Sequence, residues 1–400
     1  MSLVASIREE ARALWGDGEG RSLAVIASSW GLLLGTRMIY PVLLPHLRDR
    51  FDLSLTVAGF LVTVLWLGSA IGQLPGGVLT DRYSERSIMT VSAAVVSVAI
   101  VSVVTAPTTL LLFVATAFVG LGQSLYPIAR ITALAGIYPE RIGSALGVTM
   151  AMGDLGQTVL PPIAGALAVA VAWQAGLGFV APLLALAAVA LWVLLSPESD
   201  TSNAVGGSTE TASRLLAELR GSNVVFFAFI FFLYVLVWQA FTGLYPTYLV
   251  EEKGLASSTA SLLFSLFFAL GVVVKPVAGI AYDRIGIRGS LVMVLSGPVV
   301  GLALLPFAEG LPALVAITAL VSAMLGSGAI TQSFFSDAFS EDVRGTGLGV
   351  VRTTTATLGA SGPVLFGVIA DSGYFDEGYL LMAAVTVFVI LLTLRVEESP

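Results

Sequence analysis

The sequence predicts an all-α membrane protein, with twelve transmembrane helices arranged as two pseudo-symmetric bundles of six. Three observations support this fold class. The 400 residues are 56% hydrophobic and only 11% charged, whereas a soluble domain carries about 25% charged residues. Apolar runs long enough to cross a bilayer as helices, about 20 residues each, follow one another along the chain. A short signature also recurs at the same place in both halves.

The apolar runs define the predicted spans, and the hydrophilic segments between them define the domains. We expect bundles over residues 22–195 and 223–395, joined by a flexible cytoplasmic linker at 196–222, with a tail at 396–400. The twelve spans are predicted at residues 23–47, 54–79, 87–106, 109–135, 143–171, 173–195, 223–250, 257–282, 290–308, 311–336, 345–370 and 378–394.

The distribution of arginine and lysine predicts the orientation in the membrane. With a cytoplasmic N-terminus, the cytoplasmic segments hold twelve arginines, and the opposite side holds only Arg48, Arg50 and Lys253. Both termini are therefore expected on the cytoplasmic side of the cell membrane. Residues 1–21 carry charges throughout, which argues against a cleavable signal peptide. Their apolar residues share one helical face, which predicts an interfacial helix on the inner leaflet.

The residue inventory limits the possible chemistry. The chain has no cysteine and a single histidine, His46, so thiol chemistry and histidine-based metal centres are not expected. Paired carboxylates and phosphate-binding loops are also missing from the sequence, which argues against an enzyme and against a nucleotide-driven pump. We expect no metal, no cofactor and no nucleic-acid partner, and a monomer in the lipid bilayer.

An internal repeat gives the chain its two halves. Residues 77–86 recur at 279–288, an offset of 202, and the same offset relates Pro161 to Pro363. One offset that holds for two loops and a helix indicates two parallel six-helix halves, related by an axis along the membrane normal. Such halves are typical of secondary transporters, in which the substrate site lies at their interface near the midplane.

The repeated segment reads Gly-x-Leu-x-Asp-Arg-x-x-x-Arg at its first copy, Gly77 to Arg86. It resembles the signature between the second and third spans of the major facilitator superfamily. The fifth span, with its glycines and Pro161-Pro162, resembles a degenerate form of the glycine-proline motif of drug and organic-solute antiporters. The resemblance covers essentially the whole chain and implies a carrier with alternating access, whose spans 1, 4, 7 and 10 line the cavity.

The resemblance also implies a latch on the cytoplasmic side that stabilises the outward-facing state. Asp81 would meet the positive N-terminal end of the eleventh span, near Gly345 and Thr346. Simple anchoring of the loops by their arginines is the alternative. The family's fourth-span arginine, expected near Thr116, is absent, which weakens the case for proton-coupled drug efflux. The predicted latch comprises Gly77, Asp81, Arg82, Arg86, Asp283, Arg284 and Arg288.

Charges inside the spans mark the candidate site, since each costs about 2.5–3.5 kcal/mol there even on a lenient scale. Arg37 lies near the middle of the first span, and the repeat places Gln239 at the equivalent position of the seventh. Arg37 either contacts the substrate or belongs to a fixed ion pair. Asp154, in the middle of the fifth span, is either a proton carrier that couples transport or the counter-ion of Arg37. Possible secondary charge sites are Arg130, Lys275 and Arg352.

Four cationic groups against one carboxylate favour an anionic substrate such as an organic carboxylate. A neutral or lipophilic solute stays open, as in a proton-coupled drug or neutral-solute exporter, and so does a sensor that transports nothing. The predicted substrate-binding residues are Arg37, Tyr40, Gln123, Tyr126, Trp238, Gln239, Tyr245 and Gln332.

Overall fold

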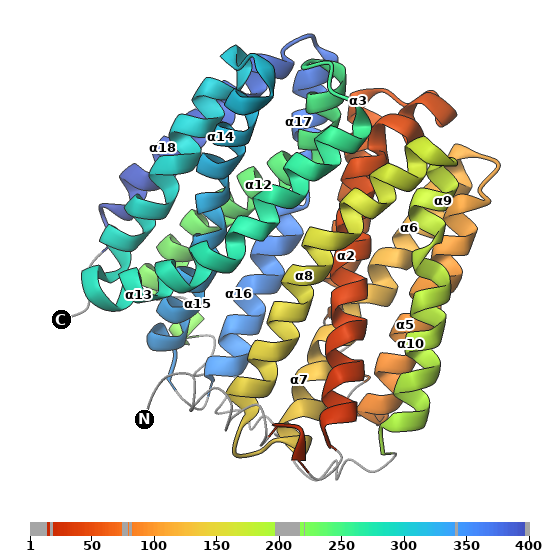
Figure 1. Cartoon of the computed structure of the whole chain (residues 1–400). Coiled ribbons are helices and arrows are strands. Elements are labelled where there is room, and N and C mark those ends of the chain that lie inside the picture. Colours follow the sequence, from red (N-terminus) through yellow and green to blue (C-terminus); the bar gives the residue numbers. More distant parts are fainter. Residues whose placement is uncertain are drawn as a thin grey trace. The chain divides into compact units, whose positions relative to one another are not determined.

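The computed structural model describes residues 14–16, 19–73, 79, 82–196, 217–219, 221–340 and 343–396. Within these ranges the only regular elements are helices (Figure 1). Most of the predicted interfacial helix, the linker and the tail lie outside the described residues, as do Gly77 and Asp81 of the predicted latch. Nine helices among the described residues are both long and apolar enough to cross a membrane.

The first six predicted spans correspond to helices α2 to α10. Spans four and six are each divided into two helices, α6 with α7 and α9 with α10. The bounds are α2 Glu19–Phe51, α3 Leu55–Ile71, α5 Glu85–Val104, α6 Thr109–Ser124, α7 Tyr126–Ile137, α8 Ile142–Ala170, α9 Trp173–Gly178 and α10 Val180–Leu194.

The last six spans correspond to helices α12 to α18. Short 3-10 segments, η3 (Leu305–Phe307) and η4 (Ala323–Gly326), extend α13 and divide the tenth span. The helix bounds are α12 Ser222–Glu251, α13 Ser257–Leu304, α14 Gly310–Ser322, α15 Ser327–Ala338, α16 Arg344–Gly359, α17 Gly362–Asp371 and α18 Phe375–Thr393.

The long helix α13 contains two spans. Gly286 interrupts it with φ 68° and ψ −176°, a conformation that a residue with a Cβ atom rarely adopts. The chain turns at this glycine in the second copy of the repeated loop. With this interruption counted, the helices trace all twelve predicted spans, and the predicted fold class is confirmed.

Two compact units share the chain. One contains Met1–Tyr40 and Gly68–Ala204, and the other contains Pro41–Leu67 and Val205–Pro400. The end of α2 and most of α3 therefore pack with the second half of the sequence rather than with the first. The predicted bundles at 22–195 and 223–395 were defined by the internal repeat, not by packing. These packing units do not test them, so the bundles stay a prediction.

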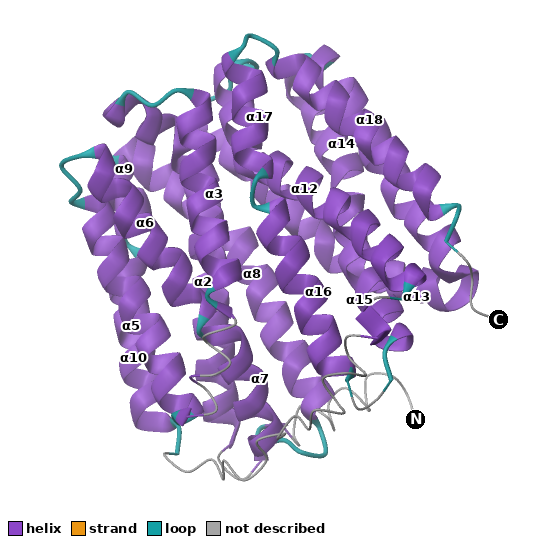
Figure 2. Cartoon of the chain, turned by 180° about the vertical axis from the view of Figure 1, so that it is seen from behind, coloured by secondary structure: helices purple, strands orange, loops and turns teal. Residues whose placement is uncertain are grey.

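In the first unit, glycines bring helix backbones into contact. Helix α5 runs beside α6 and α10 (Figures 1 and 2). Helices α2 and α8 meet at Gly31, Gly35 and Gly156, where a Cβ atom on Gly156 would overlap the carbonyl oxygen of Gly31. Close approach through small residues is a common way for membrane helices to pack, because lipid supplies no hydrophobic force between them.

Aromatic rings fill much of the second unit. The ring centroids of Phe241 and Tyr245 are 4.5 Å apart, and those of Tyr248 and Tyr379 are also 4.5 Å apart. Glycine again permits a close approach of spans seven and eleven, since a Cβ atom on Gly362 would lie 2.6 Å from the carbonyl oxygen of Leu236.

Contacts at the predicted outer end of the second unit hold α2 and α3 to the later helices. Arg48 pairs with Glu251. The carboxylate of Asp371, the last residue of α17, accepts hydrogen bonds of 2.7 Å from the backbone amides of both Leu55 and Thr56. It therefore caps the first turn of α3 from another helix.

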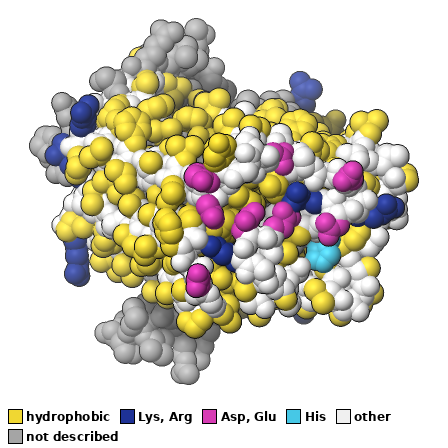
Figure 3. Space-filling model, turned by 90° about the horizontal axis from the view of Figure 1, so that it is seen from above, with side chains coloured by type: hydrophobic (Ala, Val, Ile, Leu, Met, Phe, Trp, Pro, Cys, Tyr) yellow, Lys and Arg dark blue, Asp and Glu magenta, His cyan; other side chains and the backbone are white. Residues whose placement is uncertain are grey.

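Acidic side chains gather at this outer end. Figure 3, which looks along the helices from above, shows them on that face. Among the described residues, three cations lie at the same end: Arg48, Arg50 and Lys253. The exposed carboxylates there are Asp49, Asp52, Glu251, Glu252, Glu309, Asp371, Asp376 and Glu377.

Candidate substrate site

Arg37 is held in the middle of the first unit by neutral groups. Its Nε atom donates to Oε1 of Gln123 at 3.1 Å, and its Nη2 atom donates to the hydroxyl of Ser69. Gln123 and Ser69 are almost completely buried, at 2% and 4% exposure, whereas Arg37 is half-buried. Three predicted spans, the first, second and fourth, therefore converge on one guanidinium.

Gln123 owes its position to a break in the fourth span. Helix α6 ends at Ser124, and α7 begins at Tyr126 with Pro127 in its first turn. Proline has no amide hydrogen to continue the α6 ladder. The amide Nε2 of Gln123 donates to the carbonyl oxygen of Leu33 at 2.9 Å, and this contact turns its Oε1 atom towards Arg37. Gln123 thus orients the guanidinium.

The positive charge of Arg37 is solvated by dipoles rather than cancelled. Among the described residues no carboxylate contacts its guanidinium, and its hydrogen-bond partners are an amide and a hydroxyl. A guanidinium has five N–H donors, and two of them are used here. A fixed cation with spare donors in a low-dielectric surrounding binds an anion strongly, and a carboxylate can match its planar geometry with two parallel hydrogen bonds.

Asp154 lies on α8, the helix that packs against α2. It is half-buried, and its Oδ1 atom accepts a hydrogen bond of 3.4 Å from Gln157 one turn later. In this conformation the guanidinium of Arg37 is held by Gln123 and Ser69 instead. The predicted roles of Asp154, as counter-ion or as proton carrier, stay predictions.

Arg130, near the start of α7, lies over an aromatic ring. Its guanidinium carbon lies 4.4 Å from the ring centroid of Trp30, and its Nη1 atom donates to the hydroxyl of Thr149 at 2.5 Å. Tyr126 stacks on the same Trp30 ring at 6.0 Å and donates its hydroxyl to the carbonyl oxygen of Ile26 at 2.9 Å. These contacts tie spans one, four and five together and give Arg130 and Tyr126 a packing role in this state.

Two other predicted tyrosines use their hydroxyls inside the protein. Thr116 donates to the hydroxyl of Tyr40 at 3.4 Å. Tyr245 and Thr318 share a hydrogen bond of 2.6 Å within the aromatic part of the second unit. Both tyrosines are fully buried, so each is positioned by its neighbours rather than open to a ligand in this conformation.

The remaining predicted site residues lie in the second unit. Gln239 is buried, at 4% exposure, and its Nε2 atom donates to the carbonyl oxygen of Ala356 at 3.4 Å. Trp238, next to it on α12, packs against Trp66 of α3 with ring centroids 5.0 Å apart. Lys275 is half-buried on α13, while Gln332 and Arg352 lie on exposed faces of α15 and α16.

The described part of the predicted latch shows two arginines at helix ends. Arg86 donates to the carbonyl oxygen of Leu195 at 3.3 Å and lies over the ring of Trp192. Arg288, its repeat equivalent, donates to the carbonyl oxygen of Val396 at 2.5 Å. Three further latch residues, Arg82, Asp283 and Arg284, are exposed. The latch itself stays a prediction.

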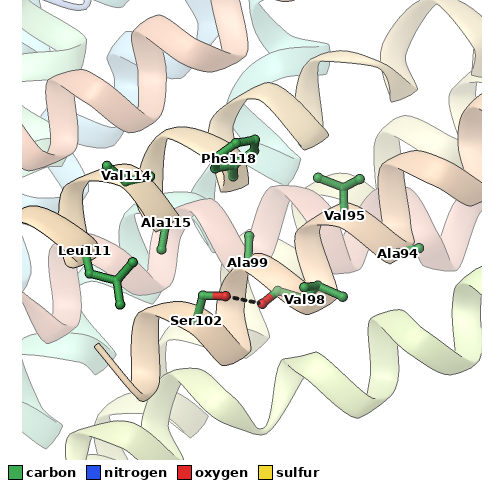
Figure 4. Close-up of a pocket in the computed structure, with 9 residues that line it drawn as sticks. All are labelled: Ala94, Val95, Val98, Ala99, Ser102, Leu111, Val114, Ala115 and Phe118. Carbon is green, nitrogen blue, oxygen red and sulfur yellow. Dashed lines mark hydrogen bonds between the residues drawn. The ribbon is translucent and has the colours of Figure 1, made fainter. Parts of the chain in front are cut away.

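A groove between α5 and α6 is a different kind of surface. It has a volume of about 490 Å³, and Figure 4 shows its lining of valine, alanine, leucine and phenylalanine side chains with Ser102. The Ser102 hydroxyl is already bonded to the carbonyl oxygen of Val98 at 3.0 Å. The groove therefore offers no polar group to a charged solute, and it holds none of the predicted site residues.

Sequence reasoning missed two residues near the predicted ones, Ser69 and Trp66. Both lie in the second span, inside an apolar run with no charge to mark them. Neither the repeat nor the loop signature covers them. Only the packing of helices shows that Ser69 contacts Arg37 and that Trp66 contacts Trp238.

Twelve apolar helices built from two repeated halves, with a partly buried arginine inside them, define a polytopic membrane carrier. The sequence model of the Major Facilitator Superfamily matches residues 25–361 and again residues 227–400. The chain belongs to this superfamily.

Relatives and solved structures agree with this membership. The hexuronate transporter of Bacillus subtilis (strain 168) is 28% identical over 375 residues, which cover 88% of each chain. The nitrite extrusion protein of the same organism is 25% identical over 385 residues, or 94% of each chain. A crystal structure of a mutant of the nucleoside transporter NupG superposes with a TM-score of 0.83 at 13% identity, covering 94% of this chain and 100% of that one. The last likeness concerns the fold alone.

Proposed function

We propose that this protein is a secondary active transporter that moves a small organic anion across the cytoplasmic membrane by alternating access. One observation carries the proposal: a half-buried guanidinium, Arg37, is oriented by neutral groups and keeps its positive charge and spare donors for a ligand. The names of two relatives, a hexuronate transporter and a nitrite extrusion protein, support an anion as the substrate class.

The empty site has a free-energy cost, because Arg37 carries a charge inside the membrane. A charged side chain inside a membrane protein is expensive unless it is compensated. Gln123 and Ser69 supply two hydrogen bonds to Arg37, and a bound carboxylate would supply the opposite charge. Because the two buried partners fix the guanidinium before the ligand arrives, little side-chain freedom is lost on binding.

Asp154 completes the proposal as the coupling or counter-ion group. It is half-buried on α8, the helix that packs against the α2 helix of Arg37, so it would either carry the coupling ion or approach Arg37 when the substrate leaves. In the counter-ion role, its carboxylate would offset the cation during the return of the empty carrier.

Location and orientation follow from charge. We propose a monomer with both termini in the cytoplasm and no enzymatic activity. The scarcity of cations at the predicted outer end, where the described residues include only Arg48, Arg50 and Lys253, supports this orientation.

Uptake into proteoliposomes tests the function. Arg37→Ala removes charge and donors, and Arg37→Lys keeps the charge but loses the planar fork. Hydrogen bonds to charged groups contribute about 1.5–3 kcal/mol, so Arg37→Ala should lower the affinity for an organic anion such as D-glucuronate about 10- to 150-fold. The Arg37→Lys variant should fall between Arg37→Ala and the wild type. Arg50→Ala, on an exposed position of the same helix, is the control and should transport normally. Normal uptake by Arg37→Ala would overturn the proposal.

Stability separates the roles of Asp154. If Asp154 balances Arg37 in the empty carrier, Arg37→Ala leaves a stranded carboxylate at a cost of about 3–5 kcal/mol. The double variant Arg37→Ala with Asp154→Ala should then be more stable than Arg37→Ala while still failing to transport. A double variant with no gain in melting temperature would exclude the counter-ion role.

A further inference from the structure

Two tryptophans and a glutamine in the second unit carry polar atoms that lack a hydrogen-bond partner in the part of the chain that the structure describes. Trp66 of α3 and Trp238 of α12 pack with their ring planes at 42°, and Gln239 follows Trp238 on the same helix. Trp66 and Gln239 are buried, at 3% and 4% exposure. Among the described residues, the Nε1 atoms of both indoles and the Oε1 atom of Gln239 are buried without a hydrogen bond.

Such orphaned groups are costly and rare. A buried donor or acceptor without a partner costs about 1–3 kcal/mol, and most buried polar atoms in proteins are satisfied. The other amide atom of Gln239, Nε2, donates to the carbonyl oxygen of Ala356, so the side chain is anchored and its oxygen is the atom left over. Trp238 and Gln239 lie in the middle of α12, and Trp66 lies in the second half of α3.

The unsatisfied atoms describe the chemistry of a ligand. Two N–H groups need acceptors, and one carbonyl oxygen needs a donor. A simple oxyanion such as nitrite offers only acceptors and would leave Gln239 unpaired. A hydroxyl group both accepts and donates, so a molecule with neighbouring hydroxyls satisfies all three atoms, while the indole rings cover its apolar C–H surface.

We propose that Trp66, Trp238 and Gln239 form a subsite for the hydroxyl groups of a polyhydroxylated organic acid. This inference rests on the proposed transport of an organic anion and narrows its substrate to hydroxylated acids. Trp66 lies on α3, and the other two residues lie on α12. The two indole N–H groups and the Gln239 oxygen would select for a hydroxylated, sugar-like acid.

Ligand-induced shifts in melting temperature of the purified protein test the subsite. D-glucuronate is the probe, and tetrahydropyran-2-carboxylate, which has the same ring and carboxylate without the hydroxyls, is the matched probe. Gln239→Met keeps the shape and removes the acceptor, and Trp66→Phe keeps a ring and removes the donor. Each should weaken the apparent affinity for D-glucuronate about 10-fold, which corresponds to one hydrogen bond of roughly 1.4 kcal/mol. Affinity for tetrahydropyran-2-carboxylate should change less than about 2-fold.

The ligand-free protein supplies an independent readout. If the indole N–H of Trp66 awaits a ligand, Trp66→Phe should leave the ligand-free melting temperature unchanged or raise it, because an unsatisfied donor is removed. A lower ligand-free melting temperature together with an unchanged D-glucuronate shift would overturn the subsite. Equal losses for both probes would overturn it as well, since hydroxyl recognition would then play no part. Wild-type protein that binds neither acid would overturn the proposed function itself.

Discussion

The two halves of the chain agree at the ends of their helices and differ in the middle. Arg86 and Arg288 are repeat equivalents, 202 residues apart, and each donates to a terminal carbonyl group of its own half, at Leu195 and Val396. Positive side chains satisfy the last carbonyls of a helix and its negative end. The loop signature therefore performs the same anchoring task twice.

A second agreement is a break in the fourth and tenth spans. Gly122 and Met324 are also 202 residues apart, and the carbonyl oxygen of each lies at a break and accepts a side-chain hydroxyl. Ser92 donates to Gly122 at 2.7 Å, and Tyr234 donates to Met324 at 3.0 Å. The interrupted backbone is common to both halves, while the donor comes from a different helix in each, α5 for Ser92 and α12 for Tyr234.

In mid-span the halves diverge. Position 37 is arginine in the first half, and its equivalent, position 239, is glutamine in the second. Around Arg37 lie an amide and a hydroxyl, whereas Gln239 follows Trp238 in a helix rich in aromatic residues. Helix ends must obey the same backbone rules in every copy, but the middle of a span is free to acquire different ligand chemistry.

The largest effect is expected where helix backbones touch. Gly156→Ala places a methyl group against the carbonyl oxygen of Gly31 and should destabilise the protein by about 1–3 kcal/mol. Gly362→Ala tests the equivalent pair of spans in the second half, where the clash, at 2.6 Å, is milder, so its loss should be smaller. Thermal unfolding of the purified variants measures both.

Gly147 supplies the control for these substitutions. It lies on α8 with Gly156, and no atom lies within 4 Å of an added Cβ. Gly147→Ala should therefore be neutral or stabilise by about 0.5–1 kcal/mol through helix propensity. A Gly156→Ala protein as stable as Gly147→Ala would show that the close approach of α2 and α8 is not needed.

A smaller effect is expected from the paired arginines. Arg86→Gln and Arg288→Gln each remove a charged hydrogen bond at a partly exposed helix end, for a loss of about 1 kcal/mol. Arg86 also lies 3.9 Å from the ring centroid of Trp192, which adds about 0.5–1 kcal/mol, so its variant should melt lower. Arg82→Gln, at an exposed neighbouring position, should be silent in the same melting experiment. Equal melting temperatures for the Arg86 and Arg288 variants would show that the Arg86–Trp192 contact does not contribute to stability.

The smallest effect is expected at Asp371, whose carboxylate caps α3 with both oxygens. Asp371→Asn keeps one acceptor and loses the second together with the charge, which should cost about 0.5–1 kcal/mol. Asp52→Asn, an exposed substitution at the same end of the protein, should leave the melting temperature unchanged. If both variants melt like the wild type, the cap contributes nothing to stability.

Hydropathy and the repeat were sufficient to predict the twelve spans and the superfamily, because bilayer thickness imposes the length and polarity of each helix. A charged residue inside an apolar span was sufficient to single out Arg37 as a candidate site residue. Neither hydropathy nor charge revealed Ser69 or Trp66, because an uncharged residue in an apolar run does not differ from its neighbours in either property. The packing of Pro41–Leu67 with later parts of the chain, where Gly59 lies close to the Pro363 backbone, was not predicted either. Contacts between residues more than 300 positions apart are not encoded in any local pattern.

The Asp371 cap on α3 makes the separation of α3 from α17 measurable by hydrogen exchange. The amides of Leu55 and Thr56 are shielded by a carboxylate that lies 316 and 315 residues away in sequence. Their hydrogens should exchange with deuterated solvent only while α17 and α3 are apart. The rate of deuterium uptake at these two amides therefore reports how often the outer ends of α17 and α3 separate. Because the donors are backbone amides, this exchange measurement can still be made after any substitution at position 55 or 56 except proline.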